Sequence, residues 1–163
     1  MSGVYSFENV VNLAKETSSK DELSAEIEEI RCKSLQLIES CGIAMVGSSD
    51  GDGYPNIKAM LKMETEGLKT FWFSTNTSSK RVKQFKDNPK ACVYFSDQAS
   101  FKGLMFVGEM VVLSDYESRK RLWREGFEVY YPQGVNDPDY SVLCFTANWG
   151  NYYHGLSNIS FKV

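Results

Sequence analysis

The sequence of 163 residues contains a single histidine, His154. One histidine excludes a histidine-rich metal cluster and the H-E-x-x-H motif of zinc proteases. A Ser-His-Asp triad would depend on this one side chain, and its neighbours Tyr153 and Gly155 do not resemble a nucleophile elbow. We therefore expect no metal site and treat His154 as an ordinary residue.

Cysteines are few, and their spacing matches no known motif. The chain has Cys32, Cys41, Cys92 and Cys144, and no two of them form a C-x-x-C pair. The spacings suit neither a zinc site nor a disulfide framework. All four lie among apolar residues, which predicts buried free thiols and a reducing compartment.

Long apolar runs and a surplus of positive charge are also absent. No stretch approaches the roughly 18 apolar residues of a membrane span, and the first ten residues lack the pattern of a signal peptide. The net charge of −3 argues against general binding of nucleic acid. With 42% hydrophobic and 24% charged residues, the composition is that of a globular domain. We expect a cytoplasmic protein.

Helical periodicity dominates the first forty residues. Apolar spacing predicts a short helix over residues 7–16 and a break over residues 17–20. Ser19 and Glu22 have the spacing of a capping box and predict a second helix that ends near Ser40. We assign residues 1–23 to an N-terminal helical extension, whose first helix, residues 7–16, docks either on the barrel or on a partner subunit.

Beyond Gly42 the pattern changes to short strands separated by turns. The predicted strands cover residues 42–48, 56–64, 67–75, 90–97, 104–115, 141–148 and 158–163. Gly108 lies within one of them and indicates a bulge or a close backbone approach. Asp115 is expected to cap a helix that places Trp123 in the core. Many strands and few helices predict a closed or half-closed β-barrel with helices at its rim.

A run of small polar residues, 74–79, separates an aromatic strand from a helix predicted over residues 79–86. One interpretation is a simple helix cap, in which Thr77 or Ser78 accepts a hydrogen bond from a helix amide. The other is a phosphate site, because a helix N-terminus favours anions and Lys80 and Arg81 follow directly. Neither a Walker A motif nor G-x-G-x-x-G occurs, so this is no standard nucleotide loop.

Lys58 strengthens the phosphate interpretation. A hairpin joining residues 56–64 to residues 68–75 would carry its ammonium toward the start of the helix, although a solvent-facing lysine remains equally possible. The aromatic strand before the polar run offers its backbone to a flat ring. These features together point to a phosphorylated aromatic ligand.

Five segments, taken in order, resemble the FMN-binding split-barrel family, the pyridoxamine 5′-phosphate oxidase-like superfamily. They are GYPNIKAM (53–60), KTFWFSTNTSSKRVKQF (69–85), DNPKACVYF (87–95), FVGEMVVLSD (106–115) and YYPQGVNDPDYSVLCF (130–145). The subgroup that the chain resembles most is the general stress protein 26-like flavoproteins. The resemblance covers residues 24–163, which we take as one split-barrel domain.

This resemblance implies a mainly β fold with flanking helices, a six-stranded antiparallel split β-barrel that forms a homodimer. Two FMN molecules would lie in clefts between the subunits, with residues near Ser100–Gly103 and Trp149 contributed across the interface. The expected cofactor-binding residues are Lys58, Ala59, Met60, Phe73, Ser74, Thr75, Ser78, Ser79, Lys80 and Trp149. For Trp149, Tyr152 and Tyr153, near the family's C-terminal aromatic position, a role at the cofactor or the interface and a purely structural role have equal weight.

Two departures from the family pattern bear on function. Lys58 stands where an arginine is usual, so a bidentate phosphate contact is lost. The C-terminal segment contains His154 but no arginine, which indicates a substrate other than pyridoxamine 5′-phosphate. The implied activity is transfer of hydride or electrons between a reduced donor, such as NAD(P)H, and a small molecule or oxygen. Alternatives are a non-catalytic flavin store or sensor, and a member that has lost FMN.

Overall fold

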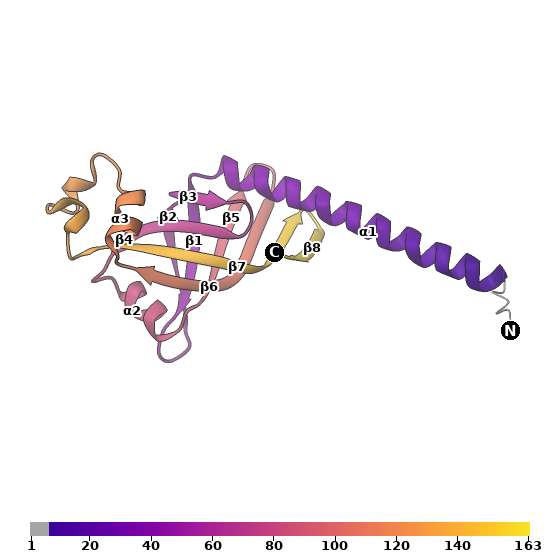
Figure 1. Cartoon of the computed structure of the whole chain (residues 1–163), viewed down its shortest axis with the longest axis horizontal. Helices are drawn as coiled ribbons and strands as arrows, with labels where there is room; N and C mark the ends of the chain where they lie inside the picture. Colours follow the sequence, from indigo (N-terminus) through magenta and orange to yellow (C-terminus); the bar gives the residue numbers. More distant parts are fainter. Residues whose placement is uncertain (1–6) are drawn as a thin grey trace.

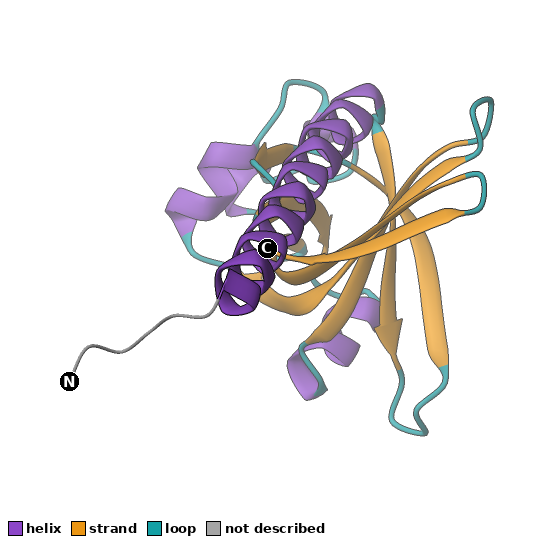
Figure 2. Ribbon diagram, turned by 90° about the vertical axis from the view of Figure 1, so that its right-hand side faces the viewer, coloured by secondary structure: helices purple, strands orange, loops and turns teal. Residues whose placement is uncertain are grey.

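A curled antiparallel sheet forms the body of the protein, and one long helix projects from it (Figure 1). The structure is a computed structural model. It describes the backbone of residues 7–163 and the side chains from residue 22 onward. Figure 2 shows how strongly the sheet twists and curls on itself, which leaves a half-closed barrel with helices at its rim. The predicted fold class is confirmed.

The projecting helix, α1 (Phe7–Ser40), is continuous over 34 residues. The predicted break over residues 17–20, and with it the helix start at Ser19, is therefore wrong. Threonine and serine lower helix propensity only slightly, whereas glycine and proline, which break helices, do not occur in this segment. The last turns of α1 rest on the barrel, where Ile30, Leu37 and Ile38 are buried.

The sheet contains eight strands rather than the six that the resemblance implied, and two of them are short. Their order is β2-β1-β5-β6-β7-β4-β3, and β8 pairs with β7. The strands are β1 (Ile43–Ser49), β2 (Pro55–Leu61), β3 (Glu64–Glu66), β4 (Thr70–Asn76), β5 (Lys90–Asp97), β6 (Lys102–Leu113), β7 (Tyr140–His154) and β8 (Ser157–Lys162).

The predicted strand over residues 56–64 divides into β2 and β3. At the division, the Lys62 amide donates to the Gly42 carbonyl beside β1, and the Met63 amide donates to the Trp72 carbonyl of β4. The predicted hairpin between residues 56–64 and 68–75 is therefore confirmed only next to its turn, where β3 pairs with Thr70–Trp72, and it is wrong for β2, which carries Lys58. Instead β2 pairs with β1, and β4 pairs with β7.

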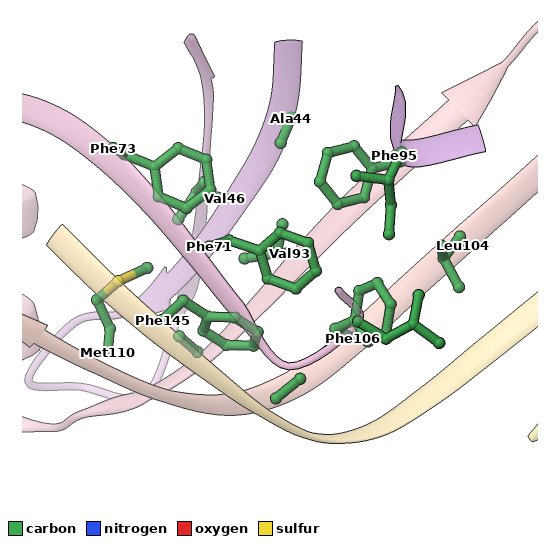
Figure 3. Close-up of a cluster of buried hydrophobic side chains, with 14 of the residues drawn as sticks. Ala44, Val46, Phe71, Phe73, Val93, Phe95, Leu104, Phe106, Met110 and Phe145 are labelled. Atoms are coloured by element: carbon green, nitrogen blue, oxygen red, sulfur yellow. The ribbon is translucent and has the colours of Figure 1, made fainter. Parts of the chain in front are cut away.

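The barrel interior is filled by aromatic and aliphatic side chains. Phe71 lies at its centre, with ring centroids 5.5 Å from Phe95, 5.1 Å from Phe106 and 6.1 Å from Phe145 (Figure 3). The bulge predicted at Gly108 is confirmed, because the β6–β7 register shifts between Val107 and Gly108. The extra residue is Asn148 of β7, opposite this step, and a bulge of this kind bends the strand that carries it.

A second apolar cluster lies at the other end of β4 and β7. It is covered by α3 (Tyr116–Leu122) and by two short 3₁₀ turns, η1 (Phe127–Val129) and η2 (Gly134–Asn136). Asp115 caps α3 by accepting the Ser118 amide, as predicted. Trp123 is half-buried and packs against this cluster, with its ring 5.3 Å from that of Tyr140, so the packing role predicted for it is confirmed but it is not fully in the core.

The four cysteines are free, but they are not all buried. Cys41, Cys92 and Cys144 are half-buried, whereas Cys32 is exposed on α1. The prediction of burial is wrong for Cys32 because it lies on the side of the helix that faces away from the barrel. No helix in the described part of the chain is long and apolar enough to cross a membrane.

Candidate functional site

A cavity of about 220 Å³ lies between β1, β2 and the helix α2 (Lys80–Asp87). It brings together three of the residues predicted from the sequence, Lys58, Ser79 and Lys80. Its walls are formed by Val46, Ser48, Asn56, Ile57, Lys58, Ser79, Lys80, Arg81 and Gln84. Lys58 reaches this place through the β1–β2 ladder, in which it lies opposite Val46, and not through a hairpin with β4.

The N-terminus of α2 forms one wall of the cavity. Ser79 has extended backbone angles, and its side chain accepts the Val82 amide, so Ser79 is the helix cap. The cap is therefore neither Thr77 nor Ser78. The first N–H groups of a helix have no partner within it, and with the helix dipole they favour an anion. The capping and anion interpretations thus describe the same residues.

Three cations surround the cavity: Lys58, Lys80 and Arg81. None of them forms an ion pair with any side chain that the structure describes. Lys58 and Lys80 are exposed and Arg81 is half-buried. Clustered like charges repel each other, and an anion between them would remove this repulsion. The cavity is therefore suited to a phosphate or a similar anion.

Arg81 is the most constrained of the three cations. Its Nη1 lies 3.0 Å from the sulfur of Met60, and its Nε is buried without a hydrogen-bond partner in the described chain. Burial lowers the pKa of the Arg81 guanidinium, and the nearby Tyr131 partly offsets this effect. A guanidinium that keeps an unpaired N–H beside a cavity is well prepared for an oxyanion.

Sequence reasoning named Arg81 as positive charge near the phosphate but left it out of the expected cofactor-binding residues, and it did not consider Gln84 at all. Gln84 lies four residues after Lys80, on the same face of α2, and both line the cavity. The i, i+4 spacing from Lys80 was a usable signal for Gln84. The hydrogen bond between Gln84 and Ser48 of β1 could not be inferred from the sequence, because the two residues are far apart along the chain.

The remaining predicted residues of β2 and β4 are divided between two faces of the sheet. Met60 is buried next to Arg81, whereas Ala59 is exposed on the opposite face. The Phe73 side chain is fully buried in the core, so only its backbone is able to meet a ligand. Ser74 Oγ lies 3.3 Å from the Tyr140 hydroxyl, and Thr75 is buried.

Ser78 and Trp149 lie outside the cavity. The Ser78 amide donates to the Asp139 carboxylate, and its side chain is exposed. Trp149 lines a larger cavity of about 740 Å³ on the outer face of the sheet. The two cavities meet at Ser48, Asn56 and Ile57. The roles predicted for these residues remain predictions.

The outer face of the sheet is unusually apolar. One row of paired residues crosses five strands: Ile57, Gly47, Cys92, Val107 and Trp149. The large apolar side chains exposed on this face are Ile43, Met45, Ile57, Leu61, Met105, Val107 and Trp149. Large exposed apolar patches are typical of protein interfaces and of ligand-binding grooves.

Comparison with known protein families gives a match over most of the chain. Residues 30–154 match the model of the family described as pyridoxamine 5′-phosphate oxidase. The chain belongs to this family. Membership supports a flavin-dependent function of the oxidoreductase type at the level of the family. The general stress protein 26-like subgroup is supported as well, by the solved structures that the chain resembles.

A protein from Clostridium acetobutylicum related to general stress protein 26 of B. subtilis, of the pyridoxinephosphate oxidase family, is 52% identical, with a TM-score of 0.76. The match covers 83% of this chain and 96% of that one. General stress protein 26 from Bacillus anthracis is 14% identical, with a TM-score of 0.68, and the match covers 82% of this chain and 98% of that one. This second likeness concerns the fold alone.

A heme binding protein from Mycobacterium smegmatis also shares the fold, with 12% identity, a TM-score of 0.61 and coverage of 77% of this chain and 55% of that one. The fold is thus associated with more than one kind of ligand. No protein of curated function matches the chain. The ligand of this chain has to be argued from its own residues.

Proposed function

We propose that this protein is an FMN-binding flavoprotein. The observation that carries the proposal is the cavity at the start of α2, where Lys58, Lys80 and Arg81 converge without a described ion-pair partner. With about 220 Å³, it is smaller than the roughly 300–1,000 Å³ of sites that enclose a whole ligand. It therefore suits the phosphate end of FMN, and the ring would lie outside it.

The residues of this chain fit that arrangement. Lys58, Ser79, Lys80 and Arg81 would hold the phosphate, and the backbone of residues 73–75 would run beside the ribityl chain and the ring. In the described chain, β3 pairs only with Thr70–Trp72, so residues 73–76 have a strand partner on one edge only, that of β7. Bound FMN would supply the hydride or electron transfer, and the protein would position it.

We further propose that the protein acts as a homodimer through its apolar outer face. Exposed Met45 and Met105 lie on either side of Tyr94 in one paired row, and Trp149 lies nearby in the next row. We call the cavity of about 740 Å³ that Trp149 lines the outer cavity, and the cavity of about 220 Å³ at the start of α2 the phosphate cavity. Because the two meet at Ile57, a second subunit on this face would border the proposed flavin site. Trp149 would then contribute to that border.

The proposed activity is oxidoreduction between a reduced donor, such as NAD(P)H, and a small acceptor or oxygen. The alternative is a flavin-binding protein without turnover. Oxidation of NAD(P)H by the FMN-loaded protein would support the enzyme, and its absence despite tight FMN binding would support the alternative.

The test of FMN binding is an absorbance spectrum after the protein is mixed with FMN and desalted. We expect about one retained flavin per chain. Lys80→Ala should release it, whereas Lys83→Ala should not, because Lys83 pairs with Asp87 and does not line the cavity. Retention by both variants, or binding of heme in place of flavin at this site, would overturn the proposal.

A further inference from the structure

Gln84 occupies an unusual position on α2. Only 7% of its surface is exposed, yet its side chain lines the phosphate cavity. It also borders a neighbouring cavity of about 470 Å³ on the other side of Lys80. Gln84 is thus a neutral polar group at the inner wall of a site that also contains the three cations Lys58, Lys80 and Arg81.

One end of the Gln84 carboxamide is fixed and the other has no partner. Its Oε1 accepts a hydrogen bond of 2.7 Å from Ser48 Oγ on β1. Its Nε2 is buried and has no hydrogen-bond partner among the described groups. Nine in ten or more of buried polar groups in proteins find a partner, so an unpaired donor beside a cavity requires an explanation.

We propose that Gln84 is a ligand-binding residue, whose amide N–H donates to the phosphate of the bound cofactor. The inference rests on the proposed function and extends it. A carboxamide NH₂ is a donor only, and an anionic oxygen is the strongest acceptor it is able to meet. Ser48 holds the other end, so the donor is oriented before the ligand arrives. Gln84 adds this donor without adding a further charge to Lys58, Lys80 and Arg81.

The test uses two substitutions of nearly the same size. Gln84→Met removes the donor and keeps the volume. It should weaken FMN binding by on the order of tenfold to a hundredfold, the range for one hydrogen bond to a charged group. Riboflavin, which lacks the phosphate, should bind as it does to the wild type. Gln36→Met, at an exposed glutamine of α1, is the matched control and should change neither affinity.

Gln84→Glu separates a ligand contact from simple packing. At pH 8 its carboxylate faces a phosphate, and FMN affinity should fall below that of Gln84→Met. As the pH is lowered toward 5, the carboxyl group takes up a proton and becomes an O–H donor, so the affinity should recover relative to the wild type. A residue with only a structural role would not produce this pH-dependent recovery.

Three results would overturn the inference. The first is an FMN affinity of Gln84→Met equal to that of the wild type. The second is an equal loss of affinity for FMN and for riboflavin in Gln84→Met. The third is a loss of FMN affinity in Gln84→Glu that does not change with pH. If the wild type fails to bind FMN, the proposed function fails separately. The side-chain NH₂ resonance of Gln84, followed while inorganic phosphate is added, then decides the inference. A saturable shift supports a phosphate contact, and no shift overturns it.

Discussion

The carboxylate of Asp139 accepts the backbone N–H of Ser78 at 2.7 Å. Its second oxygen accepts the Asn76 side-chain amide at 2.9 Å, and the Asp139 carbonyl accepts the Thr77 amide at 2.7 Å. One residue of the loop before β7 therefore holds three consecutive residues of the loop that leads into α2. Because the phosphate cavity begins at Ser79, Asp139 fixes the chain directly before the site.

We expect Asp139→Asn to lower the melting temperature at neutral pH, and the difference to disappear in acid. The hydrogen bonds from Asn76 and then from Ser78 lower the pKa of Asp139 in the folded protein. Its carboxylate therefore contributes stability above the unfolded-state pKa of about 3.9, and this contribution is lost as the pH falls through the lower folded value. Melting curves of both proteins between pH 7 and pH 3 would check this.

Asp52→Asn is the control for that series, because Asp52 is exposed in the β1–β2 turn and its carboxylate accepts no hydrogen bond from the described chain. Its melting temperature should follow the wild type across the range. A constant difference between Asp139→Asn and the wild type from pH 7 to pH 3 would show that the carboxylate charge is not what holds the loop.

We expect Met45→Glu to convert the proposed homodimer into a monomer. Met45 is 44% exposed at the middle of the apolar outer face, and it lines neither cavity. An unpaired carboxylate buried in an interface costs several kcal/mol, more than most dimers of this kind tolerate. Analytical ultracentrifugation would measure the mass against the 18.5 kDa of one chain. Flavin retention should fall with the dimer, since the outer cavity borders the site.

Val129→Glu tests whether any apolar-to-charged change on the surface has this effect. Val129 is 81% exposed at the end of η1, a short turn whose Phe127 packs against the second apolar cluster and which belongs to none of the strands of the sheet. This variant should remain a dimer and keep its flavin. A Met45→Glu protein that sediments as the wild type would locate the interface elsewhere.

The sequence predicts well whatever depends on neighbouring residues. The strand alternation, the cap at Asp115 and the start of α2 after the polar run are local patterns, and the structure contains each of them. The break in α1 was wrong because polar residues without glycine or proline do not end a helix whose later turns are held by packing.

Strand pairing could not be read in the same way. Lys58 reaches the cavity because β2 pairs with β1, and a hairpin with β4 was an equally reasonable arrangement of the same sequence. Gln84 was missed for a related reason. Its importance depends on Ser48, which folding brings to it across 36 positions. The pairing register between strands that are distant in the sequence depends on the packing of the whole core, so it cannot be predicted from a short motif.

We expect one fast-reacting thiol per chain when the folded protein is treated with a disulfide reagent such as DTNB. Cys32 is exposed, whereas the other cysteines are half-buried, and burial raises the pKa of the Cys144 thiol, which reduces its reactive thiolate. Cys32→Ser should abolish the fast phase and leave the slow phases unchanged. A fast phase that persists in Cys32→Ser would mean that another cysteine is accessible in solution.

The bulge at Gly108 leads to the last prediction. A Cβ atom at this position would lie 2.0 Å from the backbone carbonyl oxygen of Thr146, which no side-chain movement relieves. We expect Gly108→Ala to lower the free energy of unfolding by about 1–3 kcal/mol, the usual range for overpacking. In urea denaturation the midpoint should fall while the slope stays constant.

Gly51→Ala is the matched control, because a Cβ atom at Gly51 has no neighbour within 4 Å and the residue lies in an exposed turn. Its free energy of unfolding should stay within about 0.5 kcal/mol of the wild type. If both variants lose the same stability, the effect is that of glycine replacement in general. A loss confined to Gly108→Ala would mean that β6 and β7 meet at the bulge too closely for any side chain.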